Sequence, residues 1–150
     1  MPIIVDTNVF IDAENDQLDL SLIPSLQFET VYMAAVTVSE LLTGVKMAQT
    51  ADEQIHRHTF VENILSHVPV LDFNSEVART YAELYGFALS QGKRSKLNVH
   101  DLQIAATALV YHYPILTSNT DDFDHIPGVQ VIKPHADKDY VHEDNSNYRT

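Results

Sequence analysis

Four acidic residues that are far apart in the sequence occupy similar local positions: Asp6, Glu40, Asp101 and Asp122. The first follows the apolar run 3–5, the second and third fall in the first turn of expected helices, and the fourth lies in a polar turn after another apolar run. If the apolar runs are parallel strands, all four positions fall on the edge of the sheet where ligands bind in such folds. Carboxylates placed this close repel one another unless a cation compensates their charge. The pattern therefore predicts a site for Mg²⁺ or Mn²⁺, which favour oxygen ligands.

An ion in such a site would keep several waters and leave positions for phosphate oxygens and for an attacking water. A divalent ion lowers the pKa of a bound water and stabilises the charge that develops on the phosphate, so no side-chain nucleophile is needed. The composition agrees with this chemistry, because the chain contains no Cys and shows no evident Ser–His pair near the acids.

Each acid also has a purely structural interpretation. Glu40 ends the segment T-V-S-E, which matches a capping box and predicts that a helix begins at Thr37. Asp101 could stand at a helix start because the helix dipole favours acids there. Asp122 could be a solvated turn residue, and His100 an ordinary surface residue at a helix start. Taken singly, these structural interpretations are the stronger ones.

Alternating strands and helices must position the acids. Short apolar and β-branched runs predict strands at 3–5, 31–36, 68–71, 115–117 and 129–132. Helical periodicity predicts helices at 9–13, from 37 onward, at 52–66 with Ile55 in its apolar stripe, from 74 to 90 and from 98 towards Pro114, whereas 18–26 reads as a short helix or loop. This alternation implies right-handed crossovers and an α/β fold with a mainly parallel sheet.

Composition indicates one compact domain followed by a polar tail. The chain has 150 residues, of which 45% are hydrophobic, with only 4 Gly and 6 Pro. Residues 135–150 are polar and without periodicity, so the domain is expected to span 1–134. No segment is long and apolar enough to cross a bilayer and no charged region precedes the first apolar run, so we expect a cytoplasmic protein that does not contact membranes.

The net charge of −12, from 21 acidic and 9 basic residues, argues against a protein that binds nucleic acid through a broad basic face. Three of the basic residues are nevertheless clustered, shortly before the third acid: Lys93, Arg94 and Lys96. We predict that this loop grips a phosphate backbone. The alternative is a merely solvated loop.

Four sequence blocks, in this order, resemble a known family. They are D-T-N-V-F at 6–10, T-V-S-E-L-L-T-G at 37–44, H-D-L-Q-I-A-A-T-A-L at 100–109 and L-T-S-N-T-D-D-F at 116–123. Together they resemble the PIN domain, specifically the VapC-type toxins of prokaryotic toxin–antitoxin pairs, over residues 3–133. The resemblance implies a three-layer α/β/α PIN-like fold with a mainly parallel central sheet.

The resemblance assigns roles by position. Asp6, Glu40 and Asp101 would be the metal-binding acids, with Mg²⁺ or Mn²⁺ as the cofactor. The fourth acidic position varies among PIN domains, and here either Asn119 or Asp122 could fill it. Thr7 and Asn8 are expected to steady the first acid, and Thr117 is expected to steady the fourth.

The resemblance further implies a metal-dependent endoribonuclease that leaves 5′-phosphate and 3′-hydroxyl ends and acts as the toxin of a type II toxin–antitoxin system. Its partners would be RNA, with tRNA as the suggested substrate, a VapB-like antitoxin and a second copy of the chain in a homodimer. The alternative is a non-catalytic PIN-like module that binds RNA or protein, which Asn119 and the net acidity favour. A phosphatase-like or nucleotide-binding domain is a weaker alternative, because no D-x-D, G-x-G-x-x-G or P-loop is present.

Overall fold

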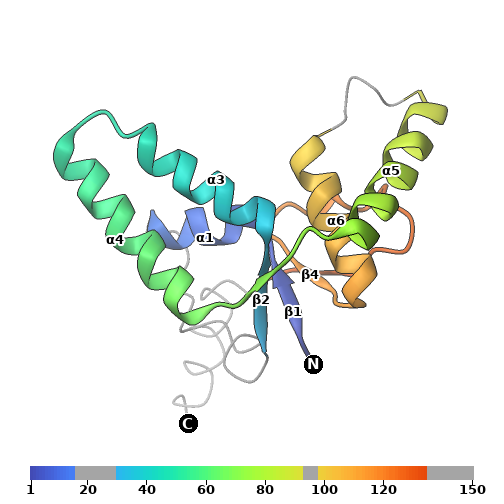
Figure 1. The fold of residues 1–150 in the computed structure, drawn as a ribbon, viewed down its shortest axis with the longest axis horizontal. Helices are drawn as coiled ribbons and strands as arrows, with labels where there is room; N and C mark the ends of the chain where they lie inside the picture. Colours follow the sequence, from blue (N-terminus) through green and yellow to red (C-terminus); the bar gives the residue numbers. More distant parts are fainter. Residues whose placement is uncertain (16–29, 93–97, 135–150) are drawn as a thin grey trace, which may run out of the picture.

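The computed structural model describes residues 1–15, 30–92 and 98–134, which form a five-stranded sheet flanked by helices (Figure 1). The strands are β1 (Ile3–Val5), β2 (Val31–Ala34), β3 (Val70–Leu71), β4 (Ile115–Leu116) and β5 (Val131–Ile132). The helices are α1 (Thr7–Glu14), α3 (Ala35–Lys46), α4 (Ala51–His67), α5 (Ser75–Ser90) and α6 (Val99–Tyr111), with a short 3₁₀ helix, η3 (Thr120–Asp122). The strand order is β3-β2-β1-β4-β5. Every neighbouring pair is parallel, so the predicted parallel α/β fold is confirmed.

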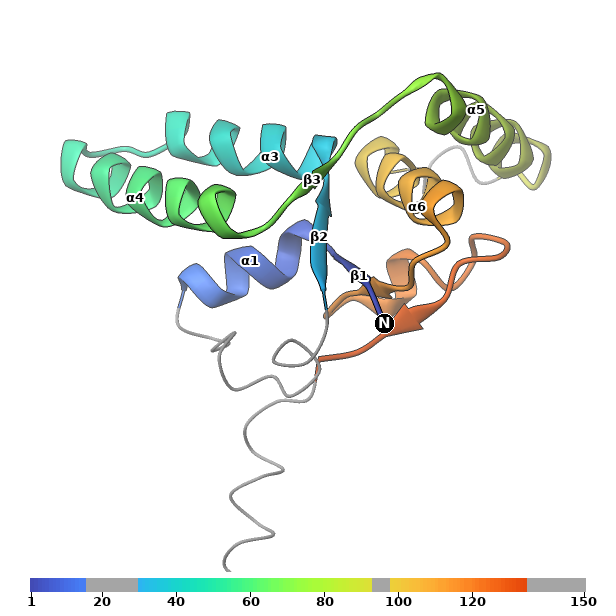
Figure 2. The same ribbon diagram turned by 60° about the horizontal axis from the view of Figure 1, so that its bottom comes forward.

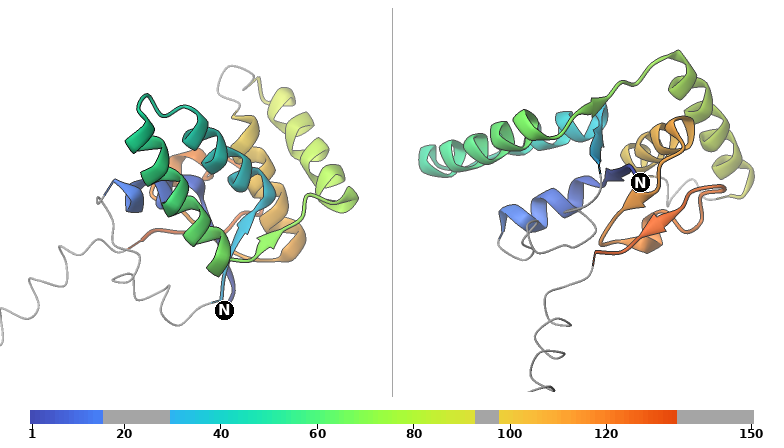
Figure 3. Two further views of the ribbon diagram at one scale, coloured as in Figure 1. Left: turned by 60° about the vertical axis from the view of Figure 1, so that its left-hand side comes forward. Right: turned by 90° about the horizontal axis from the view of Figure 1, so that it is seen from below.

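The central strand β1 is buried on both faces, and its side chains alternate between two apolar clusters. Ile4 joins the cluster that includes α5 and α6, whereas Ile3 and Val5 join the cluster that includes α1, α3 and α4. Figure 2 and Figure 3 show these two groups of helices on opposite sides of the sheet. The expected three-layer arrangement is therefore confirmed.

The strand register determines which residues meet beyond the carboxyl ends of the strands. Val5 at the end of β1 pairs with Leu116 at the end of β4. The next residues along the two strands, Asp6 and Thr117, therefore become neighbours, and the Asp6 backbone N–H donates to the Leu116 carbonyl at 2.9 Å. Because α1 starts directly after β1 and α3 directly after β2, the start of each helix lies at this edge of the sheet.

The predicted capping box at Thr37 is wrong. Helix α3 begins at Ala35 and has Ala34 as its N-cap, without a side-chain cap, so the strand predicted for 31–36 ends at residue 34. Thr37 is fully buried inside the helix, and its hydroxyl hydrogen-bonds with that of Thr7 at 3.0 Å. Glu40 therefore lies in the second turn rather than the first. The Thr37 hydroxyl is thus paired with Thr7 of α1 and does not cap its own helix.

The local predictions for the two later helices agree better with the structure. Asn98 caps α6, with its Oδ1 accepting from the backbone N–H groups of His100 and Asp101 at 3.0 and 3.3 Å, and the helix ends at Tyr111, before Pro114. Helix α4 is confirmed, but Ile55, expected in its buried stripe, is 66% exposed. None of the helices in the described ranges is both long and apolar enough to cross a bilayer. The segments 18–26, 93–96 and 135–150 lie outside the described residues.

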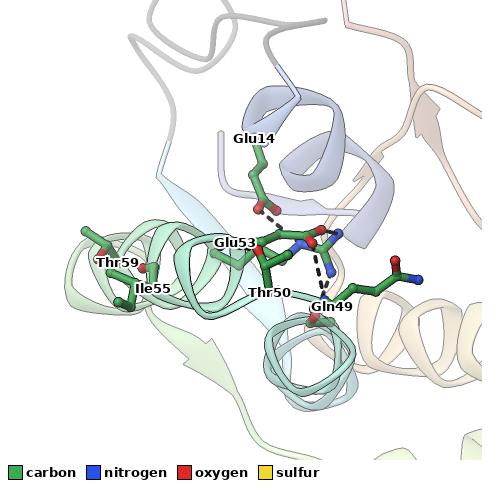
Figure 4. Close-up of polar contacts among 8 residues, drawn as sticks. Glu14, Gln49, Thr50, Glu53, Ile55 and Thr59 are labelled. Atoms are coloured by element: carbon green, nitrogen blue, oxygen red, sulfur yellow. Dashed lines mark hydrogen bonds and ion pairs between the residues drawn. The ribbon is translucent and has the colours of Figure 1, made fainter.

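A polar network joins the helices on the α1 side of the sheet. Arg57 of α4 donates from Nη1 to the Gly44 carbonyl of α3 at 2.9 Å, and its Nε lies 3.9 Å from Glu14 Oε1 of α1. Its Nη2 also forms an ion pair with Glu53 one turn earlier in α4. Thr50 caps the same helix by accepting from the Glu53 backbone N–H, and Figure 4 shows this turn close to Glu14. The three helices are thereby tied together around one side of the site.

Candidate active site

Asp6 is the most deeply buried acid of the site. Only 1% of the residue is exposed, and its Oδ2 accepts a hydrogen bond from the Thr117 hydroxyl at 2.8 Å. Burial raises the pKa of Asp6 to about 6, although the hydrogen bonds from the Thr117 hydroxyl and the Thr7 backbone lower it. The negative charges of Glu40 and Asp122 raise it further. Asp6 is thus a carboxylate whose charge the fold leaves largely uncompensated.

Glu40 is held by contacts from two other helices. Its Oε1 accepts from the Thr7 hydroxyl of α1 at 2.9 Å, and its Oε2 lies 3.3 Å from Nδ1 of His100 at the start of α6. The Thr7 hydroxyl also hydrogen-bonds with Thr37. The structural interpretation of Glu40 as a helix cap is therefore wrong, because both of its oxygens are engaged away from the start of α3.

Asp101 lies in the first turn of α6, and its carboxylate interacts electrostatically with the other three acids. Burial raises the pKa of Asp101 to about 7, and the charges of Asp6, Asp122 and Glu40 add to that rise in this order. The four acids selected from the sequence therefore lie within electrostatic reach of one another, although they come from the start of α1, from α3, from α6 and from η3. The parallel strands β1, β2 and β4 place Asp6, Glu40 and Asp122 beyond their carboxyl ends, whereas Asp101 is carried there by α6, which in the described part of the chain follows a helix rather than a strand.

The turn after β4 separates the two candidates for the fourth acidic position. Asp122 is half-buried, and its charge raises the pKa of both Asp6 and Asp101. Asn119 is exposed, and its backbone N–H donates to the Thr117 hydroxyl oxygen at 3.0 Å. Asp122 is thus the residue of this turn that acts electrostatically on the other acids.

The supporting residues contact the acids only partly as expected. Thr117 donates its hydroxyl hydrogen to the first acid, Asp6, and contacts the fourth position only through the backbone of Asn119. Thr7 uses its hydroxyl on the second acid and its backbone N–H on the first. Within the described residues, the side chain of Asn8 makes no hydrogen bond to Asp6.

The donor chemistry of this site fits a hard divalent cation. All four acids offer oxygen, which Mg²⁺ and Mn²⁺ prefer, and in the described part of the chain no Lys or Arg forms an ion pair with them. Over residues 1–15, 30–92 and 98–134, no three acidic or histidine side chains already form the close arrangement of a metal centre. A bound ion would therefore have to draw the carboxylates closer together, and it would relieve their repulsion by doing so.

A pocket of about 160 Å³ opens beside Glu40, between α1, α3 and α4. Its polar lining includes Glu14, Glu40 and Arg57, and the remaining lining residues are Ile11, Asn15, Leu41, Gly44, Val45 and Val61. A Cβ atom added to Gly44 would meet no other atom within 4 Å, so this glycine leaves space open. The pocket is therefore a partly apolar recess with two carboxylates and one guanidinium in its wall.

Comparisons with known proteins agree with this geometry. Residues 3–129 match the PIN domain family. A protein named Ribonuclease VapC from Rickettsia bellii is 34% identical over 132 residues, which cover 88% of this chain and 96% of the relative. This chain belongs to the PIN domain family, among its VapC-type members. The resemblance seen in the four sequence blocks is therefore confirmed.

Solved structures of other family members share the fold. VapBC-5 from Mycobacterium tuberculosis, a member of the VapBC family of toxin–antitoxin systems, matches with a TM-score of 0.69 and 32% identity, covering 90% of this chain and 98% of that chain. VapBC2 from Rickettsia felis, bound to a DNA fragment from its promoter, matches with a TM-score of 0.78 at 22% identity, covering 90% of this chain and all of that chain. Because the sequence identity of this second match is only 22%, it supports a shared fold and nothing further.

Sequence reasoning misses two residues of the site. The capping pattern places Thr37 at a helix start, although the residue is buried against Thr7. The interpretation of His100 as a surface residue agrees with its side chain being 53% exposed, yet its ring contacts Glu40. The sequence signal for His100 is its position directly before Asp101 in the H-D block. No local pattern predicts its contact with Glu40, which lies 60 residues earlier in the chain.

Proposed function

We propose that this protein is a metal-dependent endoribonuclease that acts as the toxin of a type II toxin–antitoxin pair. The observation that carries the proposal is the uncompensated cluster of acids, in which burial and three neighbouring carboxylates raise the pKa of Asp101 to about 7. The proposal is supported by a relative named as a ribonuclease and by neighbours named as toxin–antitoxin complexes.

In this proposal Asp6, Glu40, Asp101 and Asp122 hold one or two Mg²⁺ or Mn²⁺ ions. A divalent ion so held supplies an activated water and neutralises charge on the RNA phosphodiester. Thr117 orients the Asp6 carboxylate and Thr7 orients that of Glu40, so two acids are preorganised before the ion binds. Asp6 and Asp101 must give up their protons to act as ligands, which links activity to pH. Asn119 stays an alternative to Asp122.

Purified protein incubated with tRNA or other structured RNA should cleave it in Mg²⁺ or Mn²⁺ and should stop cleaving when EDTA removes the metal. The products should carry 5′-phosphate ends, which a 5′-phosphate-dependent exonuclease detects. Cleavage that persists in EDTA would contradict the proposed cofactor. Metal-loaded protein that binds RNA or a partner without cutting would instead favour the non-catalytic module, which is the alternative that the net acidity suggests.

A VapB-like antitoxin is the proposed protein partner. The recess between α1, α3 and α4 supports this proposal, because it adjoins Glu40 and carries two carboxylates but only one guanidinium, that of Arg57, which lies 3.9 Å from Glu14. The homodimer, the RNA contacts of Lys93, Arg94 and Lys96, and tRNA as substrate stay predictions from the sequence.

Gly44→Leu is expected to weaken antitoxin binding by at least about tenfold, or about 1.4 kcal/mol. The added side chain would occupy space that Gly44 leaves open in the recess. The fold should not suffer, because Leu is favoured over Gly in a helix by up to about 1 kcal/mol. The affinity for the co-expressed product of the neighbouring short reading frame provides the measurement.

Gly86→Leu is the matched control. Gly86 lies in α5, and a Cβ atom added there would also meet open space, but this glycine does not line the recess. The control variant should gain the same helix stability and bind the antitoxin like the wild type. Equal binding by both variants would exclude the recess as the antitoxin site.

A further inference from the structure

His100 contacts the second acid of the site from a separate helix. Its Nδ1 lies 3.3 Å from Glu40 Oε2, while the Thr7 hydroxyl donates to Glu40 Oε1 at 2.9 Å. A glutamate side chain has three rotatable torsions, so two contacts from two helices restrict it far more than one does. We propose that His100 is a positioning residue that holds the Glu40 carboxylate in the orientation in which it binds the divalent cation. This inference rests on the proposed metal-dependent function.

The hydrogen-bonding capacity of Glu40 allows both contacts and a metal ion at once. A carboxylate has about four acceptor positions, two on each oxygen. The hydrogen bond to Oε1 and the 3.3 Å contact with Oε2 therefore leave acceptor capacity on each oxygen for a cation. A partner that orients a metal ligand in this way typically changes metal affinity by about 10- to 100-fold when it is removed.

The position of the His100 ring depends on the start of α6. The Asn98 side chain accepts from the His100 backbone N–H at 3.0 Å and thereby orders this first turn. The His100 side chain is 53% exposed, so close packing does not account for its location. Its contact with Glu40, which is 27% exposed, spans α6 and α3. The contact therefore joins the helix that carries Asp101 to the helix that carries Glu40.

Mn²⁺ binding to the full-length protein tests this inference without using activity. Titration calorimetry with MnCl₂ should show that His100→Ala weakens Mn²⁺ affinity about tenfold, while the urea midpoint of the metal-free protein stays unchanged. His100→Asn should restore most of the affinity, because its amide nitrogen can stand where Nδ1 stands and donate to Glu40. His56→Ala, at an exposed position of α4, is the control and should bind Mn²⁺ like the wild type.

Four results would overturn the positioning role. Unchanged Mn²⁺ affinity in His100→Ala would show that the contact is incidental, and tighter binding would show that the ring competes with the ion. An equal loss in the Ala and Asn variants would show that the imidazole itself is needed, as for a direct ligand. If the wild type binds no Mn²⁺ at all, the proposed cofactor fails together with this inference, whereas the other results leave the proposed function standing.

Discussion

Asp101→Asn is expected to lower metal-dependent RNA cleavage by at least about a hundredfold while stabilising the metal-free fold at pH 8. The loss of activity follows because the substitution removes a ligand, and charge stabilisation by a bound ion contributes several kcal/mol to a transition state. The gain in stability follows because burial and the charges of Asp6, Asp122 and Glu40 all disfavour the Asp101 carboxylate, and a neutral amide does not suffer from them.

The expected gain is about 1–2 kcal/mol of unfolding free energy, which is less than the full rise in the pKa of Asp101 implies, because solvent screens a partly exposed carboxylate. Urea unfolding in EDTA measures the stability, and cleavage of labelled RNA in Mn²⁺ measures the activity. Asp124→Asn, at an exposed position beyond η3, is the control and should change neither quantity. A variant of Asp101 that loses both activity and stability would indicate a structural role instead.

The metal-free protein is expected to lose stability as the pH rises from about 4 to about 8. In the unfolded chain both aspartates have a pKa near 3.8, whereas in the fold the pKa is about 6 for Asp6 and about 7 for Asp101. Between these values the folded state keeps protons that the unfolded state has released, so a rise in pH favours unfolding. Below about pH 3.8 both states are protonated and this contribution vanishes. The expected total loss is a few kcal/mol.

Mn²⁺ should reverse this trend. An ion binds the deprotonated carboxylates of the folded state, so the stabilisation that it provides should grow with pH. Urea unfolding at pH 5 and pH 7.5, in EDTA and in Mn²⁺, measures both effects. The double variant Asp6→Asn with Asp101→Asn removes both titrating groups and should show a much flatter dependence on pH in EDTA. If the double variant kept the slope of the wild type, other groups would be responsible for it.

Local sequence patterns predicted the fold class and the acidic site. Runs such as Ile3–Val5 can bury both faces only in the middle of a sheet, and an acid directly after such a run must lie at the carboxyl end of the strand. Asn98 as a helix cap is similarly local, because the residues that it caps are two and three positions away. These features depend on residues that are close together in the chain, so they can be predicted from the sequence alone.

The sequence by itself thus determined the parallel α/β fold and the PIN-type motifs, whereas it left the choice between Asn119 and Asp122 open. Only the tertiary structure decided which side chains hold the acids of the site. Thr117 reaches Asp6 across 111 positions and Thr7 reaches Glu40 across 33. Such contacts depend on strand register and helix packing, which set distances of a few ångströms between residues that no local pattern connects. For the same reason, a hydroxyl that could cap its own helix is instead buried against another one.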